Sequence, residues 1–460
     1  MGTEEGTART RRMFGTDGVR DVANIGMMTP EAVLRLGRAY VMFLEGLGYK
    51  RPHIAVGRDT RISGAMLESA LSAGITSAGG DVSLLGVIPT PGVSFAALHG
   101  GFDGGAVISA SHNPAEYNGV KFLDKDGFKL TDDDEIIIEK IFEEAEPSAK
   151  HPMHGAVGRI FDGSRFAREY VGVLTALLER VKKRDCRLVI DAANGAAFSV
   201  VQQLFEKWDG EVSFLAKDPD GMNINSGVGV THMDHICAET VKRGADIGIA
   251  YDGDTDRVLM CDFKGRVIDG DIMLWVIGRW LAAKGALGSG LVATVMSNMA
   301  LEDLLAKDNI KVFRCNVGDR YVLDVMRKEA CRLGGEQSGH IIALDYANTG
   351  DGLCSGVLFL MAIDELGEDI SSLVDKFDRY PQVLRNMRIR DKSKIMGSPK
   401  LAEAIAEAQS MLSGKGRMLL RPSGTEPLVR IFVESRDTDL MNKTADMLEE
   451  RISEIISSEV

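Results

Sequence analysis

The chain has 460 residues, 45% of them apolar and 26% charged, with a formal net charge of −13 at pH 7. We expect a soluble globular protein of three or four domains at this length. The acidic balance argues against a general nucleic-acid-binding or membrane-surface role, because both need a basic footprint, and it leaves the binding of any anionic ligand to local cations.

Three stretches share an order of apolar strand, turn, helix and second strand. Strands are expected at residues 53–57, 82–85, 187–190, 291–295 and 311–313, and helices up to residue 78 and at residues 198–208. Each stretch has the pattern of a βαβ unit, which predicts three related mixed α/β domains. Their spacings differ, so this is a similarity of pattern and not a sequence repeat.

The C-terminal stretch has a different order. Strands are expected from Tyr380 and at residues 417–420 and 428–433, and helices at residues 401–412 and 439–455. This order predicts a small α+β cap domain. We therefore expect an α/β protein whose domains surround a central cleft, with bounds at residues 1–157, 158–262, 263–372 and 373–460.

The spacing of the cysteines and the length of the apolar runs indicate the cellular compartment. The six cysteines stand singly, without Cys-x-x-Cys spacing, so they indicate neither a zinc site nor a redox pair. Residues 1–12 are polar and do not have the pattern of a signal peptide. The longest apolar run, Ile272 to Ala283, contains Arg279 and is too short to span a bilayer. We expect a cytoplasmic protein.

Three aspartates alternate directly after an apolar stretch that has the pattern of a buried strand. They are Asp252, Asp254 and Asp256, and Arg257 follows them. At an effective dielectric constant of about 20, two unit charges about 4 Å apart repel by roughly 4 kcal/mol, so converging carboxylates need a cation or protons. Mg²⁺ is the first choice, and a solvated acidic turn is the alternative. A calcium EF-hand is excluded, because Arg257 and Phe263 stand where its loop requires Gly and Glu.

A polar loop follows the strand expected from Gly105. Pro114 keeps this loop out of a β-ladder, so we expect Ser111 to be exposed. Ser111 is a candidate nucleophile or phosphate carrier that needs a base or prior activation. A serine that only caps a helix or a turn is the alternative. We group the neighbouring His112 with it as a catalytic candidate.

Glu336, Ser338 and His340 alternate in a third polar loop. In an extended segment they would face one side and offer an acceptor, a hydroxyl and an imidazole to a polyhydroxyl ligand. A structural histidine is the alternative for His340.

A fourth loop combines small residues, hydroxyls and two arginines. Its candidate residues are Arg421, Ser423, Gly424, Thr425 and Arg430. Small residues let backbone N–H groups converge and the arginines add positive charge, so we expect a phosphate-binding loop. A plain surface turn is the alternative.

Together, these loops resemble those of the α-D-phosphohexomutase superfamily, and within it most closely the bacterial phosphoglucosamine mutases. The resemblance runs from Met13 to Arg430 and includes further motifs at residues 13–20, 57–64, 88–92, 317–322 and 349–352. It implies that Ser111 is a phosphoserine that donates its phosphoryl group to a sugar. Its phosphate would share one Mg²⁺ with the three aspartates.

The resemblance also implies roles for single residues. Lys121 would be the general acid or base, with a pKa depressed by burial beside cations. Arg20 would steady the transferring phosphate. The third loop would bind the sugar hydroxyls, and Arg257 belongs to the same substrate-binding set. The fourth loop would hold the phosphate that does not react.

The implied reaction interconverts glucosamine 6-phosphate and glucosamine 1-phosphate through glucosamine 1,6-bisphosphate, which is also the expected primer. The product would feed the synthesis of UDP-N-acetylglucosamine and hence of the cell wall. Gln337 favours the amino sugar, whereas Asp21 and Asn316 depart from the family's pattern near two loops.

Several alternatives stay open. A phosphomannomutase or phosphoglucomutase would use the same mechanism on another sugar. A Mg²⁺-dependent phosphatase would release inorganic phosphate, and a silent binder would hold the sugar phosphate without turnover. In each case the expected partner is a small-molecule sugar phosphate, with no nucleic acid or membrane, and the protein is a monomer or a homodimer.

Overall fold

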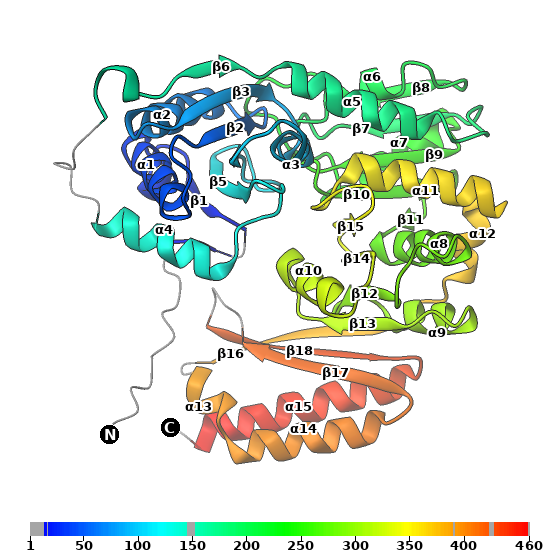
Figure 1. The fold of residues 1–460 in the computed structure, drawn as a ribbon. Coiled ribbons are helices and arrows are strands. Elements are labelled where there is room, and N and C mark those ends of the chain that lie inside the picture. Colours follow the sequence, from blue (N-terminus) through cyan, green and yellow to red (C-terminus); the bar gives the residue numbers. More distant parts are fainter. Residues whose placement is uncertain (1–12, 16, 145–151, 390–391, 423–426, 459–460) are drawn as a thin grey trace. The chain divides into compact units, whose positions relative to one another are not determined.

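The computed structural model describes residues 13–15, 17–144, 152–389, 392–422 and 427–458. The chain divides into two compact units, Met1–Ser297 with Leu305–Lys376, and Asn298–Leu304 with Phe377–Val460. Three sheets of the described residues belong to the first unit and one to the second (Figure 1). The expected fold class is confirmed, because three α/β segments precede an α+β segment.

The first sheet is mixed, with the strand order β1-β5-β4-β2-β3-β6. Its strands are β1 (Val19–Val22), β2 (His53–Arg58), β3 (Asp81–Val87), β4 (Gly104–Ile108), β5 (Tyr117–Asp124) and β6 (Ile160–Asp162). Its helices are α1 (Pro30–Gly46), α2 (Gly64–Ser77), α3 (Thr90–His99) and α4 (Asp132–Glu144), with a short 3₁₀ turn at Gly26–Met28. Apolar residues of α1, α2 and the central strands form one core, in which Tyr40 stacks on Phe122.

The second sheet has the order β11-β10-β9-β7-β8. Its strands are β7 (Leu188–Asp191), β8 (Val212–Leu215), β9 (Ile247–Tyr251), β10 (Val258–Asp262) and β11 (Val267–Ile268). The accompanying helices are α5 (Arg165–Leu178), α6 (Val200–Leu204) and α7 (Met233–Arg243), with a 3₁₀ turn at His154–Ala156. The strands β7, β9 and β10 are buried along their whole length, which agrees with their apolar sequences.

The third sheet has the order β13-β12-β14-β15. Its strands are β12 (Leu291–Thr294), β13 (Val312–Cys315), β14 (Leu333–Gly335) and β15 (Ile341–Ala343). Its helices are α8 (Gly270–Ala283), α9 (Met299–Lys307), α10 (Asp319–Lys328), α11 (Gly352–Leu366) and α12 (Ile370–Lys376). The run Ile272–Ala283 lies within α8, a buried helix. None of the described helices has the length and apolarity that a bilayer crossing requires.

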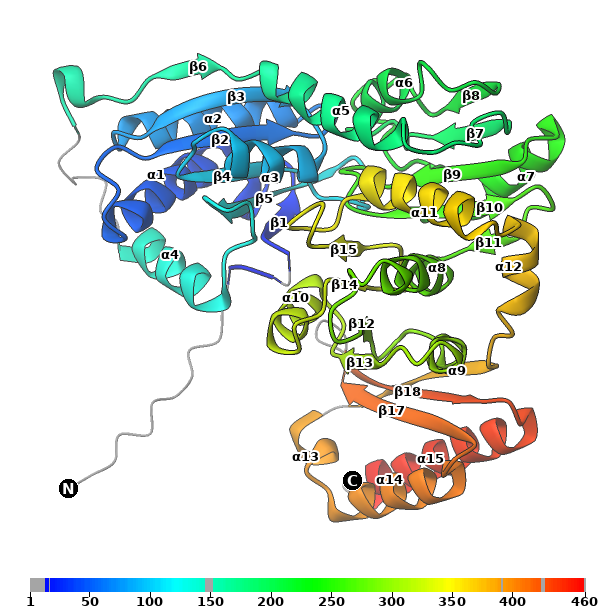
Figure 2. The ribbon, with the colours of Figure 1, turned by 45° about the vertical axis from the view of Figure 1, so that its right-hand side comes forward.

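The second unit contains an antiparallel sheet in the order β16-β18-β17. Its strands are β16 (Gln382–Arg388), β17 (Gly416–Pro422) and β18 (Leu428–Ser435), and its helices are α13 (Lys392–Met396), α14 (Pro399–Leu412) and α15 (Thr438–Ser458). The helices α14 and α15 lie side by side on one face of this sheet (Figure 2), where their apolar residues form the core. The strand and helix order expected for this segment is present, with α13 in addition.

Two short strands extend the sheet of the preceding α/β segment. The strand β6 pairs with β3 of the first sheet, and β11 pairs with β10 of the second. We propose the four-domain division at residues 1–157, 158–262, 263–372 and 373–460, in which these two strands reach across to the preceding domain. All six cysteines are free.

Candidate active site

The three aspartates lie in the loop of the β9–β10 hairpin, where Tyr251 pairs with Val258. All three are buried, and one ligand atom from each lies within 4.8 Å of the others. Among the residues that the structure describes, one oxygen each of Asp254 and Asp256 is buried without a hydrogen-bond partner. Buried, unpartnered carboxylate oxygens that converge fit a hard divalent cation, so this loop is compatible with a metal ion.

Two backbone features shape this aspartate loop. Thr255 adopts a positive φ of 66°, which turns the chain between Asp254 and Asp256. Gly253 packs against the loop of Ser111, and a Cβ atom at this position would lie 2.6 Å from the carbonyl oxygen of Ser111. A side chain at Gly253 would therefore force the two loops apart.

The charges of the aspartates are not equivalent. Burial and the neighbouring carboxylates Asp256 and Asp254 raise the pKa of Asp252 well above its usual value. Burial alone would also raise the pKa of Asp254, but the ammonium group of Lys121 holds that pKa below its usual value. The loop therefore combines one carboxyl that resists ionisation with one that is strongly stabilised as the anion.

Ser111 lies between β4 and β5 and contacts the aspartate loop directly. Its hydroxyl donates to Oδ2 of Asp252 at 2.8 Å, and Nδ1 of His112 lies 3.3 Å away. The expectation of an exposed serine is wrong, because Ser111 is only 1% exposed. Pro114 does keep the segment out of the ladder, but the aspartate loop covers it.

A buried arginine fixes the backbone of the Ser111 loop. Arg61 donates to the carbonyl oxygens of Ser111 and Asn113 at 3.0 and 2.7 Å, and to those of Pro114 and Tyr117. Ser111 itself has a positive φ of 51°, which is strained for a residue with a side chain. The hydrogen bonds of Arg61 hold that conformation in place.

Arg61 is in turn held by a second layer of polar groups. It pairs with Asp59, which also accepts a hydrogen bond from Ser109 Oγ at 2.6 Å. The same Ser109 hydroxyl accepts from the backbone N–H of Ser111 at 2.9 Å. Asn225, in the segment between β8 and α7, also donates to the carbonyl oxygen of Ser111, at 2.8 Å. Few conformations of the Ser111 loop allow all of these hydrogen bonds at once.

Lys121 lies on β5, and its ammonium group is 2.8 Å from both Asp17 and Asp254. Burial by itself would lower the pKa of Lys121, but these two carboxylates raise it above its usual value. The expected depression of this pKa is therefore wrong, because the nearest charges are anions. Lys121 is positioned as a charged proton and hydrogen-bond donor.

The ion pairs of Lys121 extend into a chain of alternating charges. Asp17 also binds Lys129 at 2.5 Å, and Lys129 pairs with Asp319 at the start of α10. We call the series Asp254, Lys121, Asp17, Lys129 and Asp319 the charge chain. It connects the second, first and third sheets of the first unit. Arg20 on β1 donates to Asp17 as well.

A cavity of about 200 Å³ is lined in part by the charge chain. Its lining includes six residues that the sequence singled out, namely Arg20, His112, Asp256, Arg257, Glu336 and His340. Burial, together with the positive charges of Arg257 and Arg20, lowers the pKa of His112 to about 4. His112 is therefore neutral near pH 7 and can act as a hydrogen-bond acceptor.

The third loop is not extended, because residues 336–340 form the turn between β14 and β15. Glu336 accepts hydrogen bonds from the N–H of Gly318 and from the hydroxyl of Ser338. Glu336 and His340 both line the cavity, whereas Ser338 is exposed and does not. Gln337 does not line it either, since its amide donates to Asp269 at the start of α8.

The fourth loop falls at the end of the β17–β18 hairpin in the second unit. Arg421 and Arg430 stand directly opposite each other in the register of the two strands. Like charges on facing positions of a sheet repel, and an anion between them relieves that repulsion. Ser423, Gly424 and Thr425 lie outside the described residues.

Sequence reasoning gave no role to Asp17, Lys129, Asp319 or Arg61. Asp17, Arg61 and Asp319 belong to segments that carry the family resemblance, at residues 13–20, 57–64 and 317–322, and this resemblance is the signal that could have found them. Lys129 carries no such signal. Of the two departures, Asp21 accepts hydrogen bonds from the N–H groups of Val22 and Met27 and so stabilises the turn after β1.

Comparison with known proteins places these features in one family. Four family models match in succession, described as phosphoglucomutase/phosphomannomutase alpha/beta/alpha domain I (residues 11–149), domain II (168–265), domain III (269–380) and C-terminal domain (384–451). The phosphoglucosamine mutase of Desulforamulus reducens is 43% identical over 96% of this chain and 100% of its own length.

Solved structures share the fold over almost the whole chain. A phosphoglucomutase/phosphomannomutase family protein from Burkholderia thailandensis aligns with a TM-score of 0.81 and 25% identity, covering 96% of this chain and 97% of its own. N-acetylphosphoglucosamine mutase of Aspergillus fumigatus, in complex with GlcNAc-6P and magnesium, aligns with a TM-score of 0.65 and 16% identity, covering 97% and 96%.

Proposed function

The chain belongs to the phosphoglucomutase/phosphomannomutase family, and we infer that it is an isomerase that interconverts glucosamine 6-phosphate and glucosamine 1-phosphate. The relative from Desulforamulus reducens supports the amino sugar as substrate. The observation that carries the mechanism is the hydroxyl of Ser111, held 2.8 Å from a buried carboxylate of the aspartate loop and next to His112.

The reaction has two balanced transfers. In the first, a free hydroxyl of the sugar monophosphate attacks the phosphorus of phosphorylated Ser111, and the bond from phosphorus to Ser111 Oγ breaks. This gives glucosamine 1,6-bisphosphate and a free serine. In the second, Ser111 Oγ attacks the other phosphate of the bisphosphate, so that the isomer leaves and the phosphoserine is restored. Glucosamine 1,6-bisphosphate also serves to prime an unphosphorylated enzyme.

We assign the metal site to Asp252, Asp254 and Asp256, with a phosphate oxygen on Ser111 as a further ligand, and Mg²⁺ as the ion. The bound metal would supply charge compensation for the phosphoryl group. The arrangement of the protein groups supports this assignment. The aspartates are buried, and the serine already contacts one of them.

The side chains around Ser111 have separate roles in proton transfer and in stabilisation of the phosphoryl group. Lys121 donates a hydrogen bond from its ammonium group and acts as the general acid. His112, neutral at pH 7 because its pKa is about 4, accepts a hydrogen bond from the attacking sugar hydroxyl, whose proton replaces the one that Lys121 gives to the leaving Ser111 oxygen. Arg20, which lines the cavity, steadies the phosphoryl group during transfer.

The cavity walls bind the sugar. Glu336 offers a carboxylate to the hydroxyl or amino groups of glucosamine phosphate, and the imidazole nitrogens of His340 have no hydrogen-bond partner among the described residues. Arg257 adds a cation at the same wall. We retain Ser338 in this set because its hydroxyl donates to Glu336, which lines the cavity. Arg421, Ser423, Gly424, Thr425 and Arg430 would hold the phosphate that does not react.

We further propose that the reaction takes place in the cytoplasm, with the sugar phosphate as the small-molecule partner and a monomer or homodimer as the working form. Its product would enter amino-sugar metabolism as a precursor of peptidoglycan. The relatives named phosphoglucosamine mutase support this placement.

The test is ³¹P NMR of the purified protein with MgCl₂, a trace of glucosamine 1,6-bisphosphate and glucosamine 6-phosphate, with parallel reactions on mannose and glucose phosphates. Fastest formation of glucosamine 1-phosphate is expected. Faster conversion of mannose or glucose phosphate would keep the phosphoserine mechanism and overturn the substrate. Release of inorganic phosphate without isomer would overturn the mutase and favour a phosphatase.

A further inference from the structure

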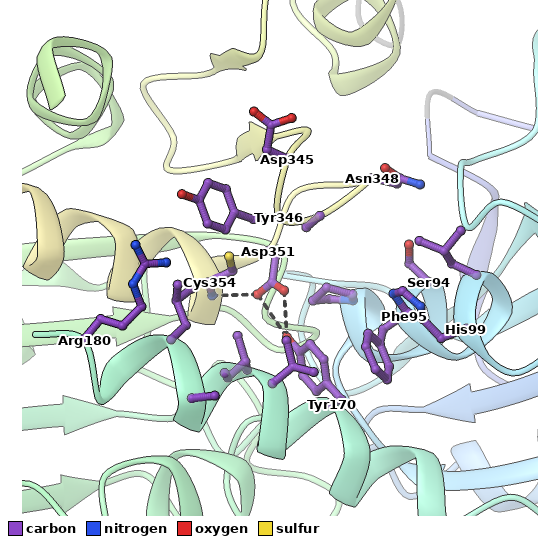
Figure 3. Close-up of a pocket in the computed structure, with 17 residues that line it drawn as sticks. Ser94, Phe95, His99, Tyr170, Arg180, Asp345, Tyr346, Asn348, Asp351 and Cys354 are labelled. Carbon is purple, nitrogen blue, oxygen red and sulfur yellow. Dashed lines mark hydrogen bonds between the residues drawn. The ribbon is translucent and has the colours of Figure 1, made fainter. Parts of the chain in front are cut away.

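A second cavity, of about 330 Å³, lies outside the proposed active site. It is formed by α3, α5 and the segment that leads into α11, and Figure 3 shows its lining. We call it the α3–α5 pocket. Its volume falls at the lower end of the range of about 300–1,000 Å³ that is usual for small-molecule sites.

The walls of the α3–α5 pocket are mainly apolar and aromatic. Phe95 and Tyr170 contribute rings that lie 5.8 Å apart, centroid to centroid. Three large apolar side chains of the lining stay exposed, with 42% of Leu98, 54% of Val173 and 36% of Tyr346 open to solvent. Exposed apolar groups that gather around a concavity indicate a ligand site.

The polar groups of the pocket define what the ligand must carry. Asp345 pairs with Arg332, and the carboxylate of Asp351 accepts hydrogen bonds from the hydroxyl of Tyr170 and the N–H of Cys354. Arg180, at one end of the lining in Figure 3, is exposed to solvent, and its charge also interacts with that of Glu365 outside the lining. Asp345 is ion-paired and the buried Asp351 has both carboxylate oxygens hydrogen-bonded, so Arg180 is the solvent-facing cation of the lining that can pair with an anionic group on the ligand.

Two helices that contribute to the pocket contact the aspartate loop through their first residues. The helix α3 begins at Thr90, whose hydroxyl donates to Oδ2 of Asp254 at 2.7 Å and whose N–H donates to the carbonyl of the same residue at 2.9 Å. The helix α11 begins at Gly352, whose N–H donates to the carbonyl oxygen of Thr255 at 2.9 Å. A displacement of either helix would therefore move a carboxylate or the backbone of the loop.

We propose that the α3–α5 pocket is a regulatory site for a flat aromatic molecule that carries one anionic group, and that its occupancy changes the affinity of the aspartate loop for a divalent cation. The regulatory part rests on the proposed function of that loop. The coupling follows from contiguous contacts, because the helices that form the pocket also bear hydrogen bonds to Asp254 and Thr255.

The first experiment measures binding. The probe is 8-anilinonaphthalene-1-sulfonate, an aromatic anion whose fluorescence rises in apolar sites, titrated into the full-length protein. Saturable binding is expected. Ala176→Trp, which fills the pocket from α5, should weaken it by about tenfold or more, and Arg180→Gln should weaken it by about tenfold. Glu169→Trp and Arg168→Gln, on the same helix but outside the lining, are the matched controls and should bind as the unchanged protein does.

The second experiment measures linkage. The dissociation constant of the probe is determined with saturating MgCl₂ and with NaCl of equal ionic strength. A change of about fivefold is expected, and calorimetry of Mg²⁺ binding with and without the probe should give the same factor. Asp254→Asn should remove the effect of MgCl₂ on probe binding.

Each outcome decides the proposal. Equal probe affinity of Ala176→Trp and the unchanged protein would overturn the site, and equal probe affinity in MgCl₂ and NaCl would overturn the regulatory coupling. Binding and linkage in a protein that shows no mutase activity would support the pocket while overturning the proposed function of the active site.

Discussion

At the scale of single residues, the site depends on the conformation and contacts of Ser111. Ser111 is buried, has a positive φ and donates to a carboxylate. Such a conformation persists only when surrounding groups fix it. The fixed geometry orients one hydroxyl toward the aspartate loop, which is the requirement for transfer of a phosphoryl group with little movement of the protein.

Replacement of the serine tests this role directly. Ser111→Ala removes the phosphate carrier and one hydrogen bond to Asp252, so we expect a loss of turnover of about 10³-fold or more with little change in thermal stability. The measurement is the conversion of glucosamine 6-phosphate, accompanied by a thermal melt. An unchanged turnover number would contradict the phosphoserine mechanism. Ser109→Ala, in the same loop, is a comparison that keeps the carrier and perturbs its position.

Arg61 is a positioning residue, since it contacts the carbonyl oxygens of the Ser111 loop and not the cavity. Arg61→Gln leaves Asp59 buried without its cation, which costs about 3–5 kcal/mol in comparable cases. Asp59→Asn with Arg61→Gln should therefore recover much of the stability of the single variant. We expect the kcat of the double variant to remain low, while its KM changes little. Full recovery of kcat together with stability would mean that Arg61 serves folding alone.

At the scale of elements, the start of α11 carries a buried acid. Asp351 caps this helix by accepting from the N–H of Cys354, and Tyr170 donates to the same carboxylate. Burial raises the pKa of Asp351 from 3.8 to about 6, although these hydrogen bonds oppose the shift. The folded state therefore binds a proton more tightly than the unfolded state between these two values of pH.

The sign of the resulting pH dependence follows from that difference. A raised carboxyl pKa in the folded state gives stability that is present at low pH and lost as pH rises from about 4 to 6, with a total of about 3 kcal/mol. Asp351→Asn keeps the cap acceptor and removes the titration. In urea denaturation, the unchanged protein should therefore lose stability relative to the variant across this range. Asp345→Asn, an exposed carboxyl at the same pocket, is the control, and parallel curves for Asp351→Asn would contradict the burial argument.

At the scale of the whole molecule, local patterns and distant contacts differ in how well a sequence reveals them. The strands of the three α/β segments and the aspartate loop follow from neighbouring residues, and the fold class was predicted from them. Ser111 contacts Asp252, which is 141 positions away, and the pKa of Lys121 is raised by Asp17 and by Asp254, the latter 133 positions away. No local pattern carries such information, so the burial of Ser111 and the pKa of Lys121 were both predicted wrongly.

The charge chain offers the last test, because it joins three sheets through side chains far apart in sequence. Lys129 and Asp319 are 190 positions apart, and both are largely buried. A double-mutant cycle with Lys129→Gln and Asp319→Asn should give a coupling energy of about 1–3 kcal/mol in the free energy of unfolding. The comparison is Lys242 with Glu239 on the surface of α7, whose coupling should be near zero. Equal coupling in the two cycles would mean that the chain orders the active site without holding the sheets together. A larger value for Lys129 and Asp319 would show that the same ion pairs that position Lys121 also connect the first and third sheets.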